Sequence, residues 1–287
     1  MASLLRWLSR CPLPWLHRLG APIGWLAYAL SPTYRRRLVA NAHQAGLAPA
    51  QYRPAIAEAG RLLLELPLLW LRPADETILP RIRWQGEEAI SDALARGRGV
   101  VFLTPHLGCF EVTAQAYAER YAPEFGPITV LFRPARKAWL RPVVGESRAR
   151  PGLATAPATL AGVRQMIRAL RRGEAVGLLP DQVPPDGLGV WAPFFGKPAY
   201  TMTLAARLVQ QTGAVPLAAW GERLAGGAGY VVHVSAFAEP LPAEPSAQAE
   251  SAAVVNRAME RLILQRPQQY LWGYHRYKTP ARRVPET

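Results

Sequence analysis

The sequence reads GVVFLTPHLGCFE over residues 99–111, and this stretch decides the fold. Its first five residues form an apolar run, β-branched and aromatic beside glycine, which is typical of a buried strand. Pro105 holds the residue before it extended and ends the strand. Helical character follows from Phe110 to Tyr121, so His106 is expected in a loop at the carboxyl end of a strand. Open α/β sheets bind their ligands at this edge.

The alternation of strand and helix continues along the chain. Further strands are expected at residues 128–132, 175–179, 214–220 and 229–237, and helices at 159–172, 203–213 and 250–266. The region before the first strand reads mainly as helices. Strands that alternate with helices predict an α/β fold with a mostly parallel, mixed sheet flanked by helices.

The amino terminus has a different composition. Residues 1–34 are rich in Leu and Trp, but prolines and basic side chains interrupt them, and the longest uncharged run has 16 residues. A helix needs roughly 20 apolar residues to cross a bilayer, so an interfacial or re-entrant segment is expected. Residues 27–29 resemble a signal-peptidase site, but the arginines at 35–37 resist translocation, so cleavage is not expected. The predicted organisation is a membrane-associating segment, 1–34, and a single domain, 35–287.

The net charge of +14 and the isoelectric point near 10.5 call for an anionic partner. Nucleic acid, an anionic lipid surface and an acidic carrier protein all qualify. Nucleic-acid binding is disfavoured because the chain has no recognisable binding motif and its amino terminus is very apolar. Cys11 and Cys109 are too few for a disulfide framework, which favours a reducing compartment.

Polar side chains follow three of the expected strands. His106 with Glu111, Arg133 and Asp181 each lie just beyond a strand end. The carboxyl ends of parallel strands share one edge of a sheet, so these groups can share a cleft. A histidine beside a carboxylate is a candidate general base, and an arginine beside it can meet an anionic substrate. The alternatives are a structural histidine, a solvated arginine and an aspartate that caps a turn.

Cys109 lies inside the same stretch. A cysteine near a histidine can form a thiolate acyl-enzyme, but an unpaired cysteine more often packs as a small apolar residue. We favour packing. No His/Cys cluster has the spacing of a metal site, so no metal is expected.

The motif His106-x4-Glu111 resembles the H-x4-D/E motif of glycerolipid-type acyltransferases. The wider pattern resembles the late (secondary) acyltransferases of lipid A biosynthesis, often called lauroyl or myristoyl acyltransferases. The matching blocks are residues 105–111, 132–134, 173–182, 193–199 and 267–278. The last block departs from the family pattern W-x-H-R-R-F-K, because this chain reads WGYHRYK over 272–278.

The resemblance implies transfer of a fatty acyl group from acyl carrier protein to a hydroxyl of a lipid A precursor. It gives His106 the role of general base and Glu111 that of holding the imidazole. Arg133, or backbone N–H groups at the start of the following helix, would meet the oxyanion. Arg133 and Arg150 could instead bind sugar phosphates, and Asp181 would be part of the site wall. No cofactor is expected beyond the acyl carrier.

The expected partners are acyl carrier protein, an anionic glycolipid acceptor and the cytoplasmic face of the inner membrane. The arginine face of residues 164–172 could dock the carrier or be a solvated helix face. A lysophospholipid, an ornithine lipid or another glycolipid remains open as acceptor, and a non-catalytic membrane scaffold as an alternative. The sequence leaves open the acyl chain length, the acylated position, a coenzyme A donor and whether the amino terminus spans the membrane.

Overall fold

The computed structural model describes residues 2–73, 75–132 and 150–281. The helices in this part of the chain are α1 (Ala2–Leu8), α2 (Leu13–Leu30), α3 (Pro32–Gln44), α4 (Pro49–Tyr52), α5 (Ala55–Leu71), α6 (Glu88–Ala95), α7 (Phe110–Arg120), α8 (Ala122–Phe125), α10 (Leu160–Arg171), α11 (Leu204–Thr212) and α12 (Gln248–Gln265). The strands are β1 (Ile82–Gln85), β2 (Val100–Leu103), β3 (Ile128–Phe132), β4 (Leu153–Pro157), β5 (Ala175–Leu178), β6 (Gly189–Phe194), β7 (Lys197–Met202), β8 (Val215–Arg223) and β9 (Tyr230–Ala236).

The described strands form a seven-stranded sheet in the order β1-β9-β8-β2-β5-β3-β4. Neighbouring strands are parallel except for β8 and β9, which are antiparallel. β6 and β7 form a separate antiparallel hairpin. The predicted α/β fold with a mostly parallel, mixed sheet flanked by helices is confirmed.

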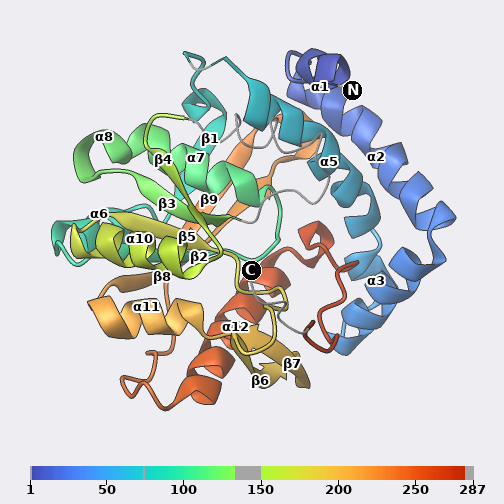
Figure 1. Cartoon of the computed structure of the whole chain (residues 1–287). Helices are drawn as coiled ribbons and strands as arrows, with labels where there is room; N and C mark the ends of the chain where they lie inside the picture. The colour runs from blue at the N-terminus through green and yellow to red at the C-terminus, as the bar shows by residue number, and fades with distance from the viewer. Residues whose placement is uncertain (1, 74, 133–149, 282–287) are drawn as a thin grey trace.

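Strand β2 lies in the middle of this sheet, and all four of its residues are buried. Val100 and Phe102 face a core that includes residues of α6, α7 and the amino-terminal helices. Val101 and Leu103 face the opposite core, with α10, α11 and α12 (Figure 1). A strand that is covered on both faces needs a continuous apolar run rather than an alternating one, which is why residues 99–103 could be recognised.

The strands that the sequence reading missed lie at the edges. β1 is polar at alternate positions, and β4 contains two alanines and a proline, so neither forms an apolar run. β6 and β7 form a separate hairpin that overlaps the block at 193–199, to which no secondary structure was assigned. The helix expected at 159–172 is found as α10, in which Met166 and Leu170 are buried and Leu160 at the start is 70% exposed.

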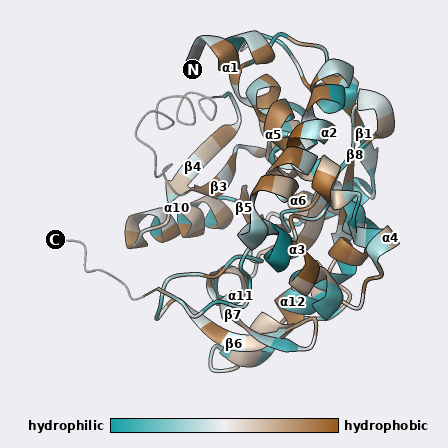
Figure 2. Ribbon diagram, turned by 90° about the vertical axis from the view of Figure 1, so that its right-hand side faces the viewer, coloured by the Kyte–Doolittle hydropathy of each residue, from teal (hydrophilic) through white to brown (hydrophobic). Residues whose placement is uncertain are grey.

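The amino-terminal helices lie side by side along one flank of the molecule (Figure 1). α2 and α5 make close backbone contact, because Cβ atoms added at Gly24 or Gly60 would lie 2.0 Å from a carbonyl oxygen of the other helix. Apolar residues are frequent along α2 and α5 (Figure 2), and Trp7 of α1 and Trp15 and Trp25 of α2 remain exposed. Among the described residues, no helix combines the length and apolar character that crossing a membrane requires.

Candidate active site

The loop between β2 and α7 carries His106 and is fixed by hydrogen bonds on two sides. On one side the Leu271 N–H donates to the carbonyl of His106 at 3.1 Å, and the Gly108 N–H donates to Gln269 O at 3.0 Å. On the other side the Cys109 N–H donates to a carbonyl of β8 at 2.8 Å. Gly108 has φ +58°, and a Cβ there would lie 2.0 Å from a β8 carbonyl oxygen, so this loop requires glycine.

Asp181 is the carboxylate that holds the imidazole. The Nδ1–H of His106 donates to Asp181 Oδ1 at 2.7 Å, and the His106 backbone N–H donates to Oδ2 at 2.9 Å. The Tyr270 hydroxyl also donates to Oδ2, at 3.1 Å. Burial alone would raise the pKa of Asp181, but the hydrogen-bonded His106 and the positive charge of Arg276 lower it below its usual value. Asp181 is therefore ionised at neutral pH.

Strand register explains why these two residues meet although 75 positions separate them. β2 and β5 are parallel neighbours in which Leu103 pairs with Leu178. His106 and Asp181 each follow their paired leucine by three positions. The same register therefore brings both side chains to the carboxyl edge of the sheet, as expected for an α/β site.

His106 lines a cavity of about 200 Å³, together with Asp181 and Gln182. With Nδ1 donating to Asp181, Nε2 is the nitrogen that can accept a proton. The Gln182 side-chain amide lies 3.0 Å from Nε2 and donates to it. The cavity also involves α3 and α5 and the carboxyl-terminal loop, through Tyr34, Ala59, Tyr270, Leu271, Gly273 and Tyr274.

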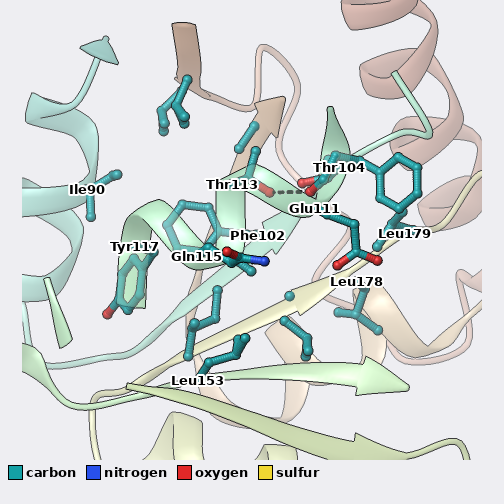
Figure 3. Close-up of a pocket in the computed structure, with 18 of the residues that line it drawn as sticks. Ile90, Phe102, Thr104, Glu111, Thr113, Gln115, Tyr117, Leu153, Leu178 and Leu179 are labelled. Carbon is teal, nitrogen blue, oxygen red and sulfur yellow. Dashed lines mark hydrogen bonds between the residues drawn. The ribbon is translucent and has the colours of Figure 1, made fainter. Parts of the chain in front are cut away.

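Asp181 is the carboxylate that hydrogen-bonds Nδ1 of His106, and the orienting role predicted for Glu111 stays a prediction. Glu111 belongs to the first turn of α7, and its side chain lines a second cavity, between this helix and the sheet. Figure 3 shows its carboxylate directed toward Leu178 in that cavity. Asp181, expected only as site wall, makes the contact with Nδ1. Whether Glu111 takes part in the reaction stays a prediction.

The second cavity is mainly apolar and begins close to the histidine. The Phe110 ring lines it and also lies 4.8 Å from the imidazole ring, centroid to centroid. Figure 3 shows Glu111 on one side of the cavity and Tyr117 and Ile90 on the other. The walls come from α7 and the sheet, and include Phe102, Val130, Leu131, Leu153, Leu178, Leu179 and Val232.

Of the two arginines predicted to bind substrate, only Arg150 is among the described residues, and it lies away from His106. Arg133 lies outside the described residues. Arg150 precedes β4, whose first residue pairs with the first residue of β3, so Arg150 lies at the amino edge of the sheet, opposite His106. Its guanidinium donates to the carbonyl of Arg72 at 2.6 Å. The prediction that Arg150 binds substrate phosphate at this site is therefore not supported by its position.

The loop that precedes α7 offers no free backbone donor for an oxyanion between His106 and Cys109. The backbone N–H groups of all four residues from His106 to Cys109 donate to protein acceptors. Donors for an oxyanion would therefore have to come from the first turn of α7 or from side chains such as Gln182.

Cys109 does not fit a nucleophile. It is fully buried, and burial followed by the charge of the nearby Glu65 raises its pKa well above the usual value. A protonated, inaccessible thiol is a poor nucleophile, so the packing interpretation holds.

A buried ionic cluster supports the histidine loop from below. Arg223 at the end of β8 donates to Glu65 of α5 at 2.6 Å and to Glu58 at 2.7 Å, and its Nη2 reaches the Gly108 carbonyl at 3.2 Å. His17 of α2 lies 2.8 Å from the other Glu65 oxygen. Through Arg223, this cluster connects α2 and α5 to the Gly108 carbonyl in the histidine loop.

Sequence reasoning missed Gln182, Tyr270 and Arg223. The first two lie in blocks that carried the family resemblance, but their roles depend on which residues they meet. In the described part of the chain, no group of three His, Cys, Asp or Glu side chains could hold a metal ion.

Comparison with known proteins agrees with this geometry. A model of the family described as bacterial lipid A biosynthesis acyltransferase matches residues 1–279. The chain is 26% identical to the lipid A biosynthesis palmitoleoyltransferase of Escherichia coli K12, over 95% of this chain and 88% of the relative. It is also 26% identical to the lipid A biosynthesis lauroyltransferase of that organism, over 97% and 90% respectively. The chain belongs to the bacterial lipid A biosynthesis acyltransferase family and is an acyltransferase.

Proposed function

We propose that this enzyme transfers a fatty acyl group from acyl carrier protein to a hydroxyl of a lipid A precursor, with His106 as general base. The observation that carries the proposal is the His106–Asp181 pair, in which Nδ1 is held at 2.7 Å and both residues line a cavity. A hydroxyl is a weak nucleophile at neutral pH and needs a base that removes its proton during attack.

In the proposed reaction the acceptor hydroxyl donates to Nε2 of His106 and attacks the thioester carbonyl carbon. Its proton passes to Nε2, and a C–O bond forms as the carbonyl becomes an oxyanion. The C–S bond then breaks, and the imidazolium returns the proton to the carrier's thiol. The ionised Asp181 stabilises the imidazolium between these steps.

Gln182 donates to the nitrogen that the acceptor hydroxyl must reach. The acceptor hydroxyl replaces the Gln182 amide as the donor to Nε2, and the released amide is then within reach of the developing oxyanion. The acyl chain would lie in the apolar cavity under α7, whose Phe110 wall contacts the imidazole. Glu111 also lines this cavity.

The enzyme is proposed to work at the cytoplasmic face of the inner membrane. The exposed tryptophans of α1 and α2 suit the interface between lipid and water. Arg35 and Arg36 of α3 are exposed and suit anionic headgroups.

The proposal is tested by incubating the purified chain with acyl carrier thioesters and a phosphorylated lipid A precursor. Mass spectrometry should find a product heavier by one acyl chain, and His106→Ala should lower kcat by about 10²–10⁴-fold. Full activity of His106→Ala would exclude the base mechanism. Transfer to a lysophospholipid or ornithine lipid in place of the precursor would assign a different acceptor, and transfer from coenzyme A alone a different donor.

A further inference from the structure

The carboxyl-terminal loop that departs from the family pattern is packed against α3, beside the cavity of His106. The Asn41 side-chain amide of α3 donates to the carbonyls of Trp272 and Tyr274, each at 2.6 Å. The Tyr34 ring fills the space in front of Gly273, where a Cβ would lie 2.1 Å from it. Tyr34, Gly273 and Tyr274 all line the His106 cavity.

Basic side chains from three segments meet where this cavity adjoins α3. Arg37 lies three residues after Tyr34 and four before Asn41, so it shares the α3 face that contacts the loop. The Lys278 ammonium lies 5.3 Å from the centroid of the Tyr274 ring. Arg37 therefore shares a helix face with Tyr34, and Lys278 lies beside Tyr274. Both tyrosines line the cavity.

The third segment is the β6–β7 hairpin. The Lys197 ammonium lies 4.9 Å from the centroid of the Tyr277 ring in the same loop. His275, in the same loop, is exposed. Its pKa is lowered by lost hydration and by the positive charges of Arg37, Lys278 and Lys197. These three cations therefore all lie near the His275 imidazole. We call these four residues the tail cluster.

No carboxylate forms an ion pair with the tail cluster among the described residues, and what sets the cluster apart is that its cations lie together beside a cavity. Elsewhere arginines are paired, for example Arg120 with Glu87 and Arg266 with Glu222. The neighbouring Arg276 is buried and donates to the Tyr200 carbonyl at 2.7 Å, so it supports the loop instead. Unpaired cations converging beside a cavity repel one another, and an anion relieves that repulsion.

We propose that Arg37, Lys197, His275 and Lys278 bind a phosphate group of the acceptor glycolipid while its hydroxyl enters the adjoining cavity toward His106. This inference rests on the proposed function, because it assumes a phosphorylated acceptor. Several cations suit a phosphate, which carries close to two negative charges at neutral pH. The tail of the chain thus has a role in acceptor recognition, separate from the chemistry at His106.

The test compares acyl transfer to a phosphorylated acceptor and to the same acceptor after enzymatic dephosphorylation. The double variant Arg37→Ala/Lys278→Ala should raise KM for the phosphorylated acceptor by about 10-fold or more, with kcat nearly unchanged. With the dephosphorylated acceptor, variant and wild type should be equal. Arg35→Ala is the matched control, since Arg35 is on the same helix but lies over the Tyr28 ring of α2.

An equal effect of the double variant on both acceptors would overturn the inference. If the wild type transferred acyl groups to neither acceptor, the proposed function itself would fail, so the two failures are distinguishable. Binding to phosphatidylglycerol vesicles distinguishes recognition of the acceptor's phosphate from general attraction to anionic lipid. The double variant should bind them as well as the wild type does, and a loss of vesicle binding larger than that of Arg35→Ala would make the cluster a membrane contact.

Discussion

Asp181 accepts three hydrogen bonds, two from His106 and one from Tyr270, and this sets what the imidazole can do. Each bond favours the ionised carboxylate over the protonated acid. Burial raises the pKa of the Tyr270 hydroxyl well above its usual value, and the charge of Asp181 raises it further, so the hydroxyl stays a donor. With the carboxylate fixed at Nδ1, the imidazole has Nε2 in the form that accepts a proton.

Replacing the orienting carboxylate should therefore affect the chemical step more than the substrate affinity. Asp181→Asn should lower kcat by about 10²–10⁴-fold, because an amide can stabilise the wrong tautomer and does not stabilise the imidazolium. Glu111→Gln is the matched comparison and should lower kcat less. Steady-state kinetics with both variants checks this. A larger loss for Glu111→Gln would return the orienting role to Glu111.

Tyr117 lines the apolar cavity at the side away from Glu111, and its hydroxyl is buried with no hydrogen-bond partner in the described part of the chain. Tyr117→Leu should deepen the cavity and shift the preference toward longer acyl chains. A mixture of acyl carrier thioesters, analysed by mass spectrometry of the products, measures the shift. Tyr117→Phe is the control, because it removes only the unpaired hydroxyl and should leave the preference unchanged.

At the scale of elements, the amino-terminal helices are joined to the sheet by charge as well as by apolar packing. α2 and α5 meet through glycines, and α5 contributes Glu65 to the buried cluster with Arg223 and His17. Burial alone would raise the pKa of Glu65, but Arg223 and His17 lower it to about 2. A carboxylate with a lowered pKa stabilises the folded state at neutral pH and loses this effect in acid.

Removing that charge should destabilise the protein strongly. Glu65→Gln should lower the free energy of unfolding by about 3–5 kcal/mol, because it removes the fully buried carboxylate that Arg223 and His17 share and leaves Arg223 only the Glu58 carboxylate. Glu239→Gln, which affects an exposed ion pair with Arg257 and Arg261, should change stability little. Urea unfolding at pH 7 compares the two variants, and equal losses would contradict the importance of the buried cluster.

The same cluster predicts a pH dependence of stability. The contribution of Glu65 is fully present above its ordinary pKa, near 4.5, and is lost as pH falls through about 2. The difference in unfolding free energy between wild type and Glu65→Gln should therefore shrink as pH falls from 5 to 2. Denaturant titrations at several pH values measure this difference. A difference that stays constant over this range would mean that Glu65 is not ionised in the folded protein.

At the scale of the whole molecule, two surfaces meet near the amino-terminal helices. One carries exposed apolar side chains, with Trp7 at 59%, Trp15 at 61% and Trp25 at 40% exposure. The other is basic, and the net charge of +14 shows that such groups dominate the surface as a whole. An apolar face next to positive charge suits the interface of an anionic bilayer.

Membrane binding should therefore depend on these tryptophans in particular. The triple variant Trp7→Ala/Trp15→Ala/Trp25→Ala should weaken binding to anionic vesicles by at least about 10-fold, because it removes apolar surface that would enter the interface. Trp191 in β6 is also exposed, at 50%, and Trp191→Ala should leave binding unchanged. Co-sedimentation with vesicles measures both, and equal effects would contradict a defined binding face.

The sequence by itself determined the features that depend on neighbouring residues. The apolar runs identified the central strands β2, β3, β5 and β8, because strands covered on both faces need continuous apolar side chains. The proline and the change of periodicity after residue 103 placed His106 in a loop at the carboxyl edge. The spaced blocks around this loop indicated the family, which the comparisons confirmed.

Only the tertiary structure decided which distant groups meet. The pairing of Leu103 with Leu178 brings Asp181 to His106, although Glu111 is far nearer in sequence. Strand order likewise places Arg150 at the opposite edge of the sheet. The packing of α3 on the carboxyl-terminal loop brings the tail cluster together. Strand order and register arise from burial summed over the whole core, and no local run of residues encodes them.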